Sequence, residues 1–182
     1  LHQLNPNIWL TWARNTRAIQ DLPDFKLWAE QNNISNYEDG FLHYREDVTL
    51  PGGLQVKGWR AECSPNCVPP ATATQRSESR VPNNIPGETL WMVPNPNFAP
   101  LQDFYAYTIH QRHQWYDNYE GTFWDWCAGA TVQSSSLLSK THEYFGISDT
   151  NWFNHPFIPA SINLIASAMN KYDQNYPNDP RM

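Results

Sequence analysis

The sequence predicts a single α+β domain that is mainly helical, with about five helices and a small antiparallel sheet. Its 182 residues are the size of one ordinary domain, and a hydrophobic share of 40%, with 14% aromatic residues, supplies ample material for a globular core. Apolar residues recur at helical spacing in several segments. Short, partly alternating runs at 41–61 and 89–93 are typical of strands, so we expect these residues to form the sheet.

Two helices are predicted before the sheet. Between residues 7 and 20, apolar side chains gather on one side at helical spacing while two arginines lie elsewhere, which indicates an amphipathic helix. Asp21 then offers an N-cap with Pro23 close behind it. The apolar residues at 25–28 favour a short second helix that fades into the turn-rich stretch 31–36. The N-terminal region therefore reads as a helical hairpin.

The sheet is predicted as a β-hairpin followed by one further strand. The arms of the hairpin, 41–48 and 54–61, flank a Pro-Gly-Gly turn at 51–53. The third strand is expected at 89–93. Between them, the segment 62–88 is rich in Pro, Ser and Asn, so we expect it to lack regular structure and to run over the surface.

Three helices are predicted after the sheet. Pro100 opens a helix that should end near Gly121. A capping-box pattern then starts a helix at 122, which should continue to about 140. Apolar periodicity predicts a final helix over 159–174. The tail from Asn175 onward is rich in Pro and Asn, and we expect it to fray. No repeat or second domain is evident, so residues 1–182 are predicted to form one globular unit.

The charge and hydropathy of the chain exclude two classes of partner. The formal net charge is −6, and the twelve Lys and Arg residues are scattered singly. Nucleic acid is therefore not an expected partner, because phosphate neutralisation needs clustered basic residues. No run approaches the roughly 20 apolar residues that cross a bilayer, so no membrane span is predicted.

Several features favour an extracellular, secreted protein. Lysine is scarce, Asn is abundant, and there are fifteen Pro residues. The chain begins at Leu1 without an initiator Met, which removal of a signal peptide would explain, as would trimming of a longer chain or disordered upstream residues. One N-glycosylation sequon, Asn33-Ile34-Ser35, lies in an expected loop.

Three cysteines are present. Cys63 and Cys67 are four apart, and Pro65 and Asn66 between them favour a turn that could bring the two sulfur atoms together. A local disulfide is one interpretation, and two free thiols or half of a zinc site are the others. If the first pair is bridged, Cys127 is left as an odd cysteine.

The strongest candidate site is a stripe of histidines and carboxylates on the helix that begins at Pro100. Positions seven apart return to nearly the same helical face, so Asp103, His110 and Asp117 would align, with His113 and Glu120 beside them. His110, His113 and Asp117 could ligate a divalent metal ion through two nitrogens and one oxygen. Glu120 would then serve as general acid or base. The same groups could also act without metal.

Two other interpretations of this region stay open. The stripe could be a solvated polar face, with apolar and aromatic neighbours turned toward the core. Alternatively, Cys127 could be a nucleophilic thiolate near a helix N-terminus, with His142 or His155 as its base. Against the thiolate, Cys127 falls on the expected apolar face, where a cysteine behaves as a small buried hydrophobe.

Aromatic residues crowd the segment after the stripe and could form a binding patch for a glycan or a protein partner. Its expected members are Trp115, Tyr116, Tyr119, Trp124 and Trp126. Asp117, Glu120 and Asp125 could also supply a carboxylate pair for glycoside hydrolysis. The chain contains no Walker loop, no Gly-x-Gly-x-x-Gly and no Gly-x-Ser-x-Gly, so neither nucleotide-dependent transfer nor Ser-elbow hydrolysis is predicted.

The sequence thus favours a secreted hydrolase-type enzyme that uses His110, His113, Asp117 and Glu120, with or without a divalent metal ion bound by the first three. Its substrate would be a small molecule or a glycan. The alternative is a non-catalytic secreted protein, such as an effector, a glycan-binding protein or an assembly subunit, that contacts a partner through the aromatic patch.

Overall fold

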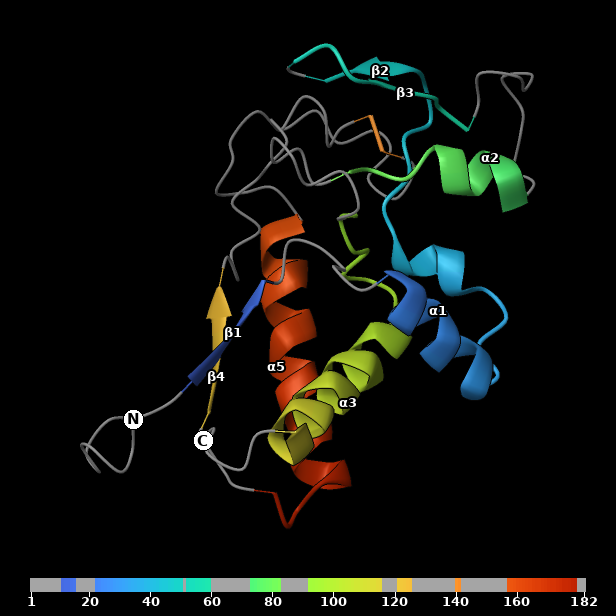
Figure 1. Ribbon diagram of the computed structural model, residues 1–182. Helices are drawn as coiled ribbons and strands as arrows, with labels where there is room; N and C mark the ends of the chain where they lie inside the picture. The colour runs from blue at the N-terminus through green and yellow to red at the C-terminus, as the bar shows by residue number, and fades with distance from the viewer. Residues whose placement is uncertain are drawn as a thin grey trace.

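The computed structural model describes residues 11–15, 22–50, 52–59, 73–82, 92–115, 121–125, 140–141 and 157–179. In this part of the chain, α-helices combine with a small two-stranded antiparallel sheet, so the architecture is roughly α+β as predicted (Figure 1). The elements are β1 (Thr11–Asn15), α1 (Leu22–Gln31), the 3₁₀ helix η1 (Tyr37–Gly40), β2 (Val48–Thr49), β3 (Gln55–Val56), α2 (Ala73–Glu78), α3 (Pro100–Trp115), β4 (Gly121–Asp125) and α5 (Phe157–Asn175).

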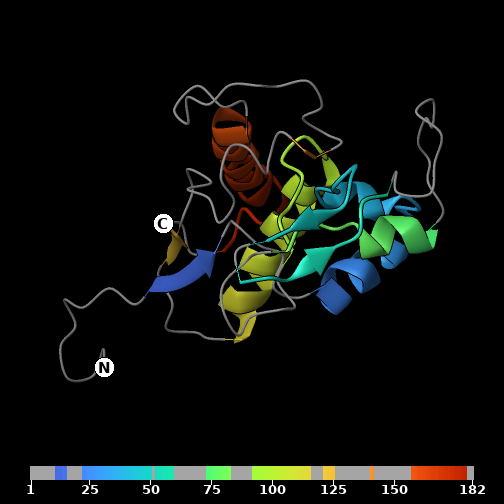
Figure 2. The same cartoon turned by 90° about the horizontal axis from the view of Figure 1, so that it is seen from above.

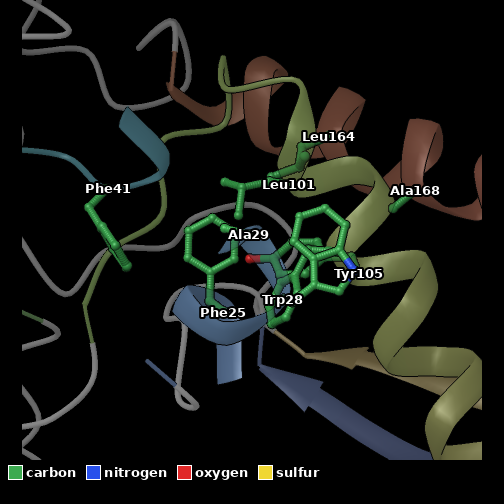
Figure 3. Close-up of a cluster of buried hydrophobic side chains, with 9 residues drawn as sticks. Phe25, Trp28, Ala29, Phe41, Leu101, Tyr105, Leu164 and Ala168 are labelled. Carbon is green, nitrogen blue, oxygen red and sulfur yellow. The ribbon is translucent and has the colours of Figure 1, made fainter. Parts of the chain in front are cut away.

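The main hydrophobic core lies where α1, α3 and α5 meet. Helices α3 and α5 pack along each other, and α1 covers the N-terminal part of α3 (Figures 1 and 3). The core residues are Phe25, Trp28, Ala29, Phe41, Leu101, Phe104, Tyr105, Leu164 and Ala168. The Phe25 ring meets Phe104 edge-on at a centroid separation of 4.9 Å, and it meets Phe41 edge-on at 5.6 Å. Gly40 ends η1 against this core, where a Cβ atom would lie 2.7 Å from Phe25 Cε1.

Three predicted helices are confirmed as α1, α3 and α5, but α3 is described only to Trp115, and Gly121, near which it was expected to end, lies in β4. Helix α1 begins beside Pro23, α3 begins at Pro100, and α5 contains Pro159 in its first turn. Helix α5 buries Leu164, Ile165, Ala168 and Tyr172, whereas Ile162 is 49% exposed.

Strands β2 and β3 lie at the top of the view in Figure 1, and in Figure 2, seen from above, they lie in front of α3. Strands β2 and β3 pair in antiparallel register, Val48 opposite Val56, around the predicted turn, in which Gly52 and Gly53 both have positive φ. The predicted hairpin is therefore confirmed at its turn, but its strands are short. Around it, the segments 41–44, 79–82 and 92–94 exchange single backbone hydrogen bonds and surround a second core. That core consists of Leu42, Tyr44, Val48, Leu50, Val56, Val81 and Val93.

Two predicted helices are wrong over the residues that the structure describes. The segments 7–20 and 122–140 were expected to be helical, yet Thr11–Asn15 and Gly121–Asp125 form β1 and β4. These strands pair in parallel, with Thr11 opposite Gly121 and Asn15 opposite Asp125. Thr, Trp and Phe favour strands, and the backbone hydrogen bonds that each segment gains from the other outweigh its local helical periodicity.

Two further expectations are corrected. The segment 62–88 was expected to be irregular and superficial, but it contains α2, and Ser79 and Val81 beyond that helix are fully buried. The tail from Asn175 onward was expected to fray, but Tyr176 and Asp179 lie against α3 through contacts with His110. The described parts of both segments make long-range contacts, which local composition does not reveal.

Candidate functional site

Helix α3 presents His110 at the boundary between the core and the surface. On its buried side, α3 contributes Phe104, Tyr105, Ala106 and Ile109, all with no exposed surface. His110 follows directly, so its side chain lies at the edge of this face and is 21% exposed. The prediction that the apolar and aromatic neighbours of the stripe point inward is confirmed for these residues.

The imidazole of His110 is fixed by the segment that follows α5. Its Nδ1 atom lies 2.7 Å from Oδ2 of Asp179, whose side chain is only 13% exposed. The ring stacks on Tyr176 with centroids 3.9 Å apart and planes 7° from parallel. The hydrogen bond and the stacking together restrict both the position and the rotation of the imidazole.

Tyr172 stabilises the carboxylate from the other side. Its hydroxyl donates a hydrogen bond of 3.2 Å to the same Asp179 Oδ2 atom. Burial raises the pKa of Tyr172 above its ordinary value, and the neighbouring charge of Asp179 and the hydrogen bond to it raise it further. The phenol is therefore a proton donor at neutral pH. We call His110, Tyr172, Tyr176 and Asp179 the His110 cluster.

This geometry defines what His110 can do chemically. A carboxylate accepts hydrogen bonds, so Nδ1 is the donor and its proton is directed at Asp179. The lone pair of the neutral ring is then on Nε2. None of the described residues hydrogen-bonds Nε2. An imidazole oriented in this way can accept a proton from a substrate, or can ligate a metal ion through Nε2.

The predicted stripe is only partly visible. His113 lies on α3 three residues after His110, and the structure describes its backbone alone. Asp117 and Glu120 lie outside the described residues. Asp103, which was expected on the same stripe, forms an ion pair with Lys171 on α5 instead, with Oδ1 3.3 Å from Nζ.

The other predicted sites fall where the structure gives no side chains. Cys63, Cys67 and Cys127 lie outside the described residues, as do His142 and His155. The same holds for the side chains of the aromatic patch, of which only Trp115 and Trp124 have a described backbone. Asp125 is described by its backbone alone, in β4. Within the described part of the chain, no three His, Cys, Asp or Glu residues are grouped as a metal site would require.

A second polar cluster joins η1 to the segment around α2. Arg80 contacts Glu38 with two nitrogens: Nε donates to Oε2 at 2.9 Å, and Nη2 donates to Oε1. His43 Nε2 lies 3.6 Å from Glu38 Oε2. Beside them, Arg76 pairs with Asp39. We call Glu38, Asp39, His43, Arg76 and Arg80 the Glu38 cluster.

The Glu38 cluster is electrostatically matched. Burial would by itself raise the pKa of Glu38, but the polar contacts with His43 and Arg80 and their charges outweigh it and lower the pKa from 4.5 to about 2. The Arg80 guanidinium also lies over the Phe41 ring at 4.8 Å from its centroid. Each charge thus faces an opposite charge or an aromatic face, which indicates a structural connection.

Sequence reasoning missed the partners of His110. Tyr172, Tyr176 and Asp179 are spaced by four and three residues, so they continue one face of α5 beyond its end. That spacing was a usable signal. It was hidden because the Pro and Asn content of the tail favours fraying.

Comparisons with protein-family models, with curated proteins and with solved structures find no match to this chain. None of the helices in the described residues is long and apolar enough to cross a membrane.

Proposed function

We propose that this chain is a hydrolase-type enzyme in which His110 acts as general base. The observation that supports this proposal is the 2.7 Å hydrogen bond from His110 Nδ1 to a largely buried Asp179 carboxylate. A histidine whose second nitrogen is oriented by a carboxylate is the recurrent arrangement for abstracting a proton from water or from a nucleophile.

Each member of the His110 cluster has a role in this mechanism. Asp179 selects the tautomer with its lone pair on Nε2 and stabilises the imidazolium that forms after proton transfer. Tyr172 keeps the carboxylate in place by donating to the same oxygen atom. Tyr176 limits ring rotation through its parallel stacking on the imidazole. His110 therefore meets the substrate in one orientation, so little ordering is needed at the moment of reaction.

The same geometry suits a metal-dependent variant of the proposal. Histidines that bind a metal usually donate their other ring N–H to a carboxylate or a carbonyl. His110 would ligate a divalent ion through Nε2, and His113 and Asp117 would complete the set predicted from the sequence. Glu120 would then act as acid or base. Elemental mass spectrometry on protein purified without chelator separates the two variants, since only this one requires near-stoichiometric metal.

The proposal includes an extracellular location and a small-molecule or glycan substrate. A net charge of −6 without a basic cluster supports a substrate other than nucleic acid. Fifteen Pro residues and scarce Lys support secretion. Detection of the full-length chain in the culture medium of its natural source, and not in the cell pellet, would support this location.

The activity test compares wild-type protein with His110→Gln and Asp179→Asn on three chromogenic probes: p-nitrophenyl acetate, p-nitrophenyl phosphate and p-nitrophenyl N-acetyl-β-glucosaminide. We expect hydrolysis of at least one probe, and a loss in kcat/KM of roughly 100-fold or more in His110→Gln, the usual size of a general-base effect. Asp179→Asn should reduce kcat because an amide can impose the wrong tautomer. Glu30→Gln, an exposed change on α1, is the matched control and should retain full activity.

Two outcomes contradict the proposal. Unchanged hydrolysis by a folded His110→Gln variant would show that the activity does not use this base. If wild-type protein hydrolyses no probe but binds immobilised glycans, and a folded Trp115→Ala, Trp124→Ala double variant does not, the non-catalytic alternative with the aromatic patch as its contact surface is favoured.

A further inference from the structure

The single glycosylation sequon lies in the turn that follows the C-terminal end of α1. The helix ends at Gln31, and Asn33 follows in the left-handed conformation with φ of 59°. The Asn33 N–H donates to the Glu30 carbonyl at 3.2 Å, and the Ile34 N–H donates to the Ala29 carbonyl at 2.8 Å. These two bonds form a Schellman motif, in which Asn is one of the few residues suited to the left-handed position.

The three residues of the sequon differ in burial: the middle residue packs inward, and the other two are exposed. Ile34 is partly buried and packs against the main core. This is the hydrophobic contact that commonly accompanies the Schellman motif. Asn33 and Ser35, on either side of it, are exposed. The amide and hydroxyl that an N-linked glycan requires are therefore at the surface of a turn whose backbone is already constrained.

The neighbouring asparagines show why Asn33 is the chemically available one. Asn32 Nδ2 donates to the Trp28 carbonyl at 2.8 Å, and Asn36 Nδ2 donates to Asp39 Oδ2 at 2.6 Å. Among the described residues, none hydrogen-bonds the Asn33 side chain. Asn33 combines the only sequon of the sequence with an exposed side chain whose amide no described residue hydrogen-bonds.

We propose that Asn33 is an N-linked glycosylation site. The donor would be a lipid-linked oligosaccharide diphosphate. The transfer forms a bond between Asn33 Nδ2 and C1 of the first sugar, breaks the bond from C1 to the diphosphate oxygen, and releases the lipid diphosphate with the amide proton. The proposal rests on the extracellular location in the proposed function and is independent of the chemistry of His110.

The glycan would cover the end of α1, and no residue of the His110 cluster belongs to this turn. A chain that carries the glycan is therefore expected to keep the same hydrolytic activity as one that lacks it. This independence allows the two proposals to fail separately.

The experiment expresses the full chain behind a secretion signal in cultured insect cells. Both the medium and the cell-retained fraction are analysed by intact mass spectrometry before and after peptide N-glycosidase treatment, so poor secretion does not hide the result. We expect most chains to be heavier by one N-linked glycan, and peptide mapping after deglycosylation in ¹⁸O-water to locate the label at Asn33. Unmodified Asn33 in a folded chain that has entered the secretory pathway would overturn the proposal.

Matched variants identify the acceptor without disturbing the turn. Asn33→Gly removes the amide but keeps a residue that favours the left-handed conformation, and Ser35→Ala removes only the hydroxyl. Both should fold and lack the glycan. Asn32→Gln, next to the sequon, should keep the glycan. A glycan that persists in Asn33→Gly would place the modification elsewhere and contradict the assignment.

Discussion

The Glu38 cluster and the His110 cluster both contain a carboxylate and a histidine, yet they differ in how the charges are matched. Glu38 receives two nitrogens of Arg80 and lies near His43, so its oxygens are surrounded by donors. In the His110 cluster, one oxygen of Asp179 serves both His110 and Tyr172. No Lys or Arg takes part in these contacts.

This difference separates a structural role from a chemical one. Buried charges that are fully paired are costly to break, and they leave no group available for a substrate. A histidine with one oriented nitrogen and one nitrogen left for a partner is suited to proton transfer or metal ligation. We therefore expect changes in the Glu38 cluster to affect mainly stability, and changes in the His110 cluster to affect function more than stability.

The largest expected effect on stability is that of Glu38→Gln. The substitution leaves the Arg80 guanidinium, whose side chain is 11% exposed, without its ion-pair partner. Removing one partner of a buried ion pair usually costs about 3 kcal/mol, so we expect the free energy of unfolding to fall by about that amount. Urea denaturation measures this change. Glu30→Gln is the control, because the Lys26–Glu30 pair is more than half exposed on both sides and should contribute no more than about 0.5 kcal/mol. If both substitutions lowered the free energy of unfolding equally, the buried Glu38–Arg80 pair would be no more important for stability than a surface pair.

The pH dependence of stability tests the same cluster without relying on packing. The folded-state pKa of Glu38 is about 2 and lies below the ordinary value of 4.5. A depressed carboxyl pKa stabilises the fold above the unfolded-state pKa, and this contribution is lost as pH falls. Wild-type stability should therefore decrease from pH 4.5 towards about 2 more steeply than that of Glu38→Gln. Parallel curves from urea denaturation across this range would contradict the charge matching.

A smaller loss of stability is expected for Asp179→Asn. This change weakens the hydrogen bonds to His110 and Tyr172 without leaving a buried charge unpaired, and it should cost about 1.5 kcal/mol. The comparison is sharpened if the same variant loses most of its hydrolytic activity while remaining folded at room temperature. A loss of stability as large as that of Glu38→Gln would instead assign the His110 cluster a structural role.

The smallest effects come from a pair of tyrosines. Tyr172→Phe removes the hydroxyl that donates to Asp179 and should cost about 1 kcal/mol. Tyr44→Phe removes a hydroxyl that is fully buried among aliphatic residues and has no hydrogen-bond partner in the described part of the chain. Its stability should change by less than about 0.5 kcal/mol or should increase. A larger loss in Tyr44→Phe than in Tyr172→Phe would reverse this ranking.

The accuracy of sequence-based prediction differs sharply between elements. Helices α1 and α3 were predictable because Pro23 and Pro100 mark their starts, and α5 was predictable from its apolar periodicity. Strands β1 and β4 were predicted as helices. They are paired across more than 100 residues, with Thr11 opposite Gly121. A prediction from neighbouring residues uses only their periodicity, which carries no information on a strand partner so far along the chain.

The candidate site was predictable only in part. Its helix and His110 follow from the chain itself, because α3 carries its own start signal and its own apolar face. Asp179 did not follow, since its contact with His110 spans 69 residues and joins two different elements. Asp103 was placed on the same stripe as His110, but Lys171 on α5 pairs with it instead.

The sequence by itself determined the α+β class, the helices α1, α3 and α5, the turn at 51–53 and the sequon at Asn33. These features depend on residues that are close in the chain, where backbone propensity and capping act. Only the tertiary structure decided that β1 pairs with β4, that Glu38 meets Arg80, and that Asp179 orients His110. Each is a contact between distant segments, and its energy exists only after the core has brought those segments together.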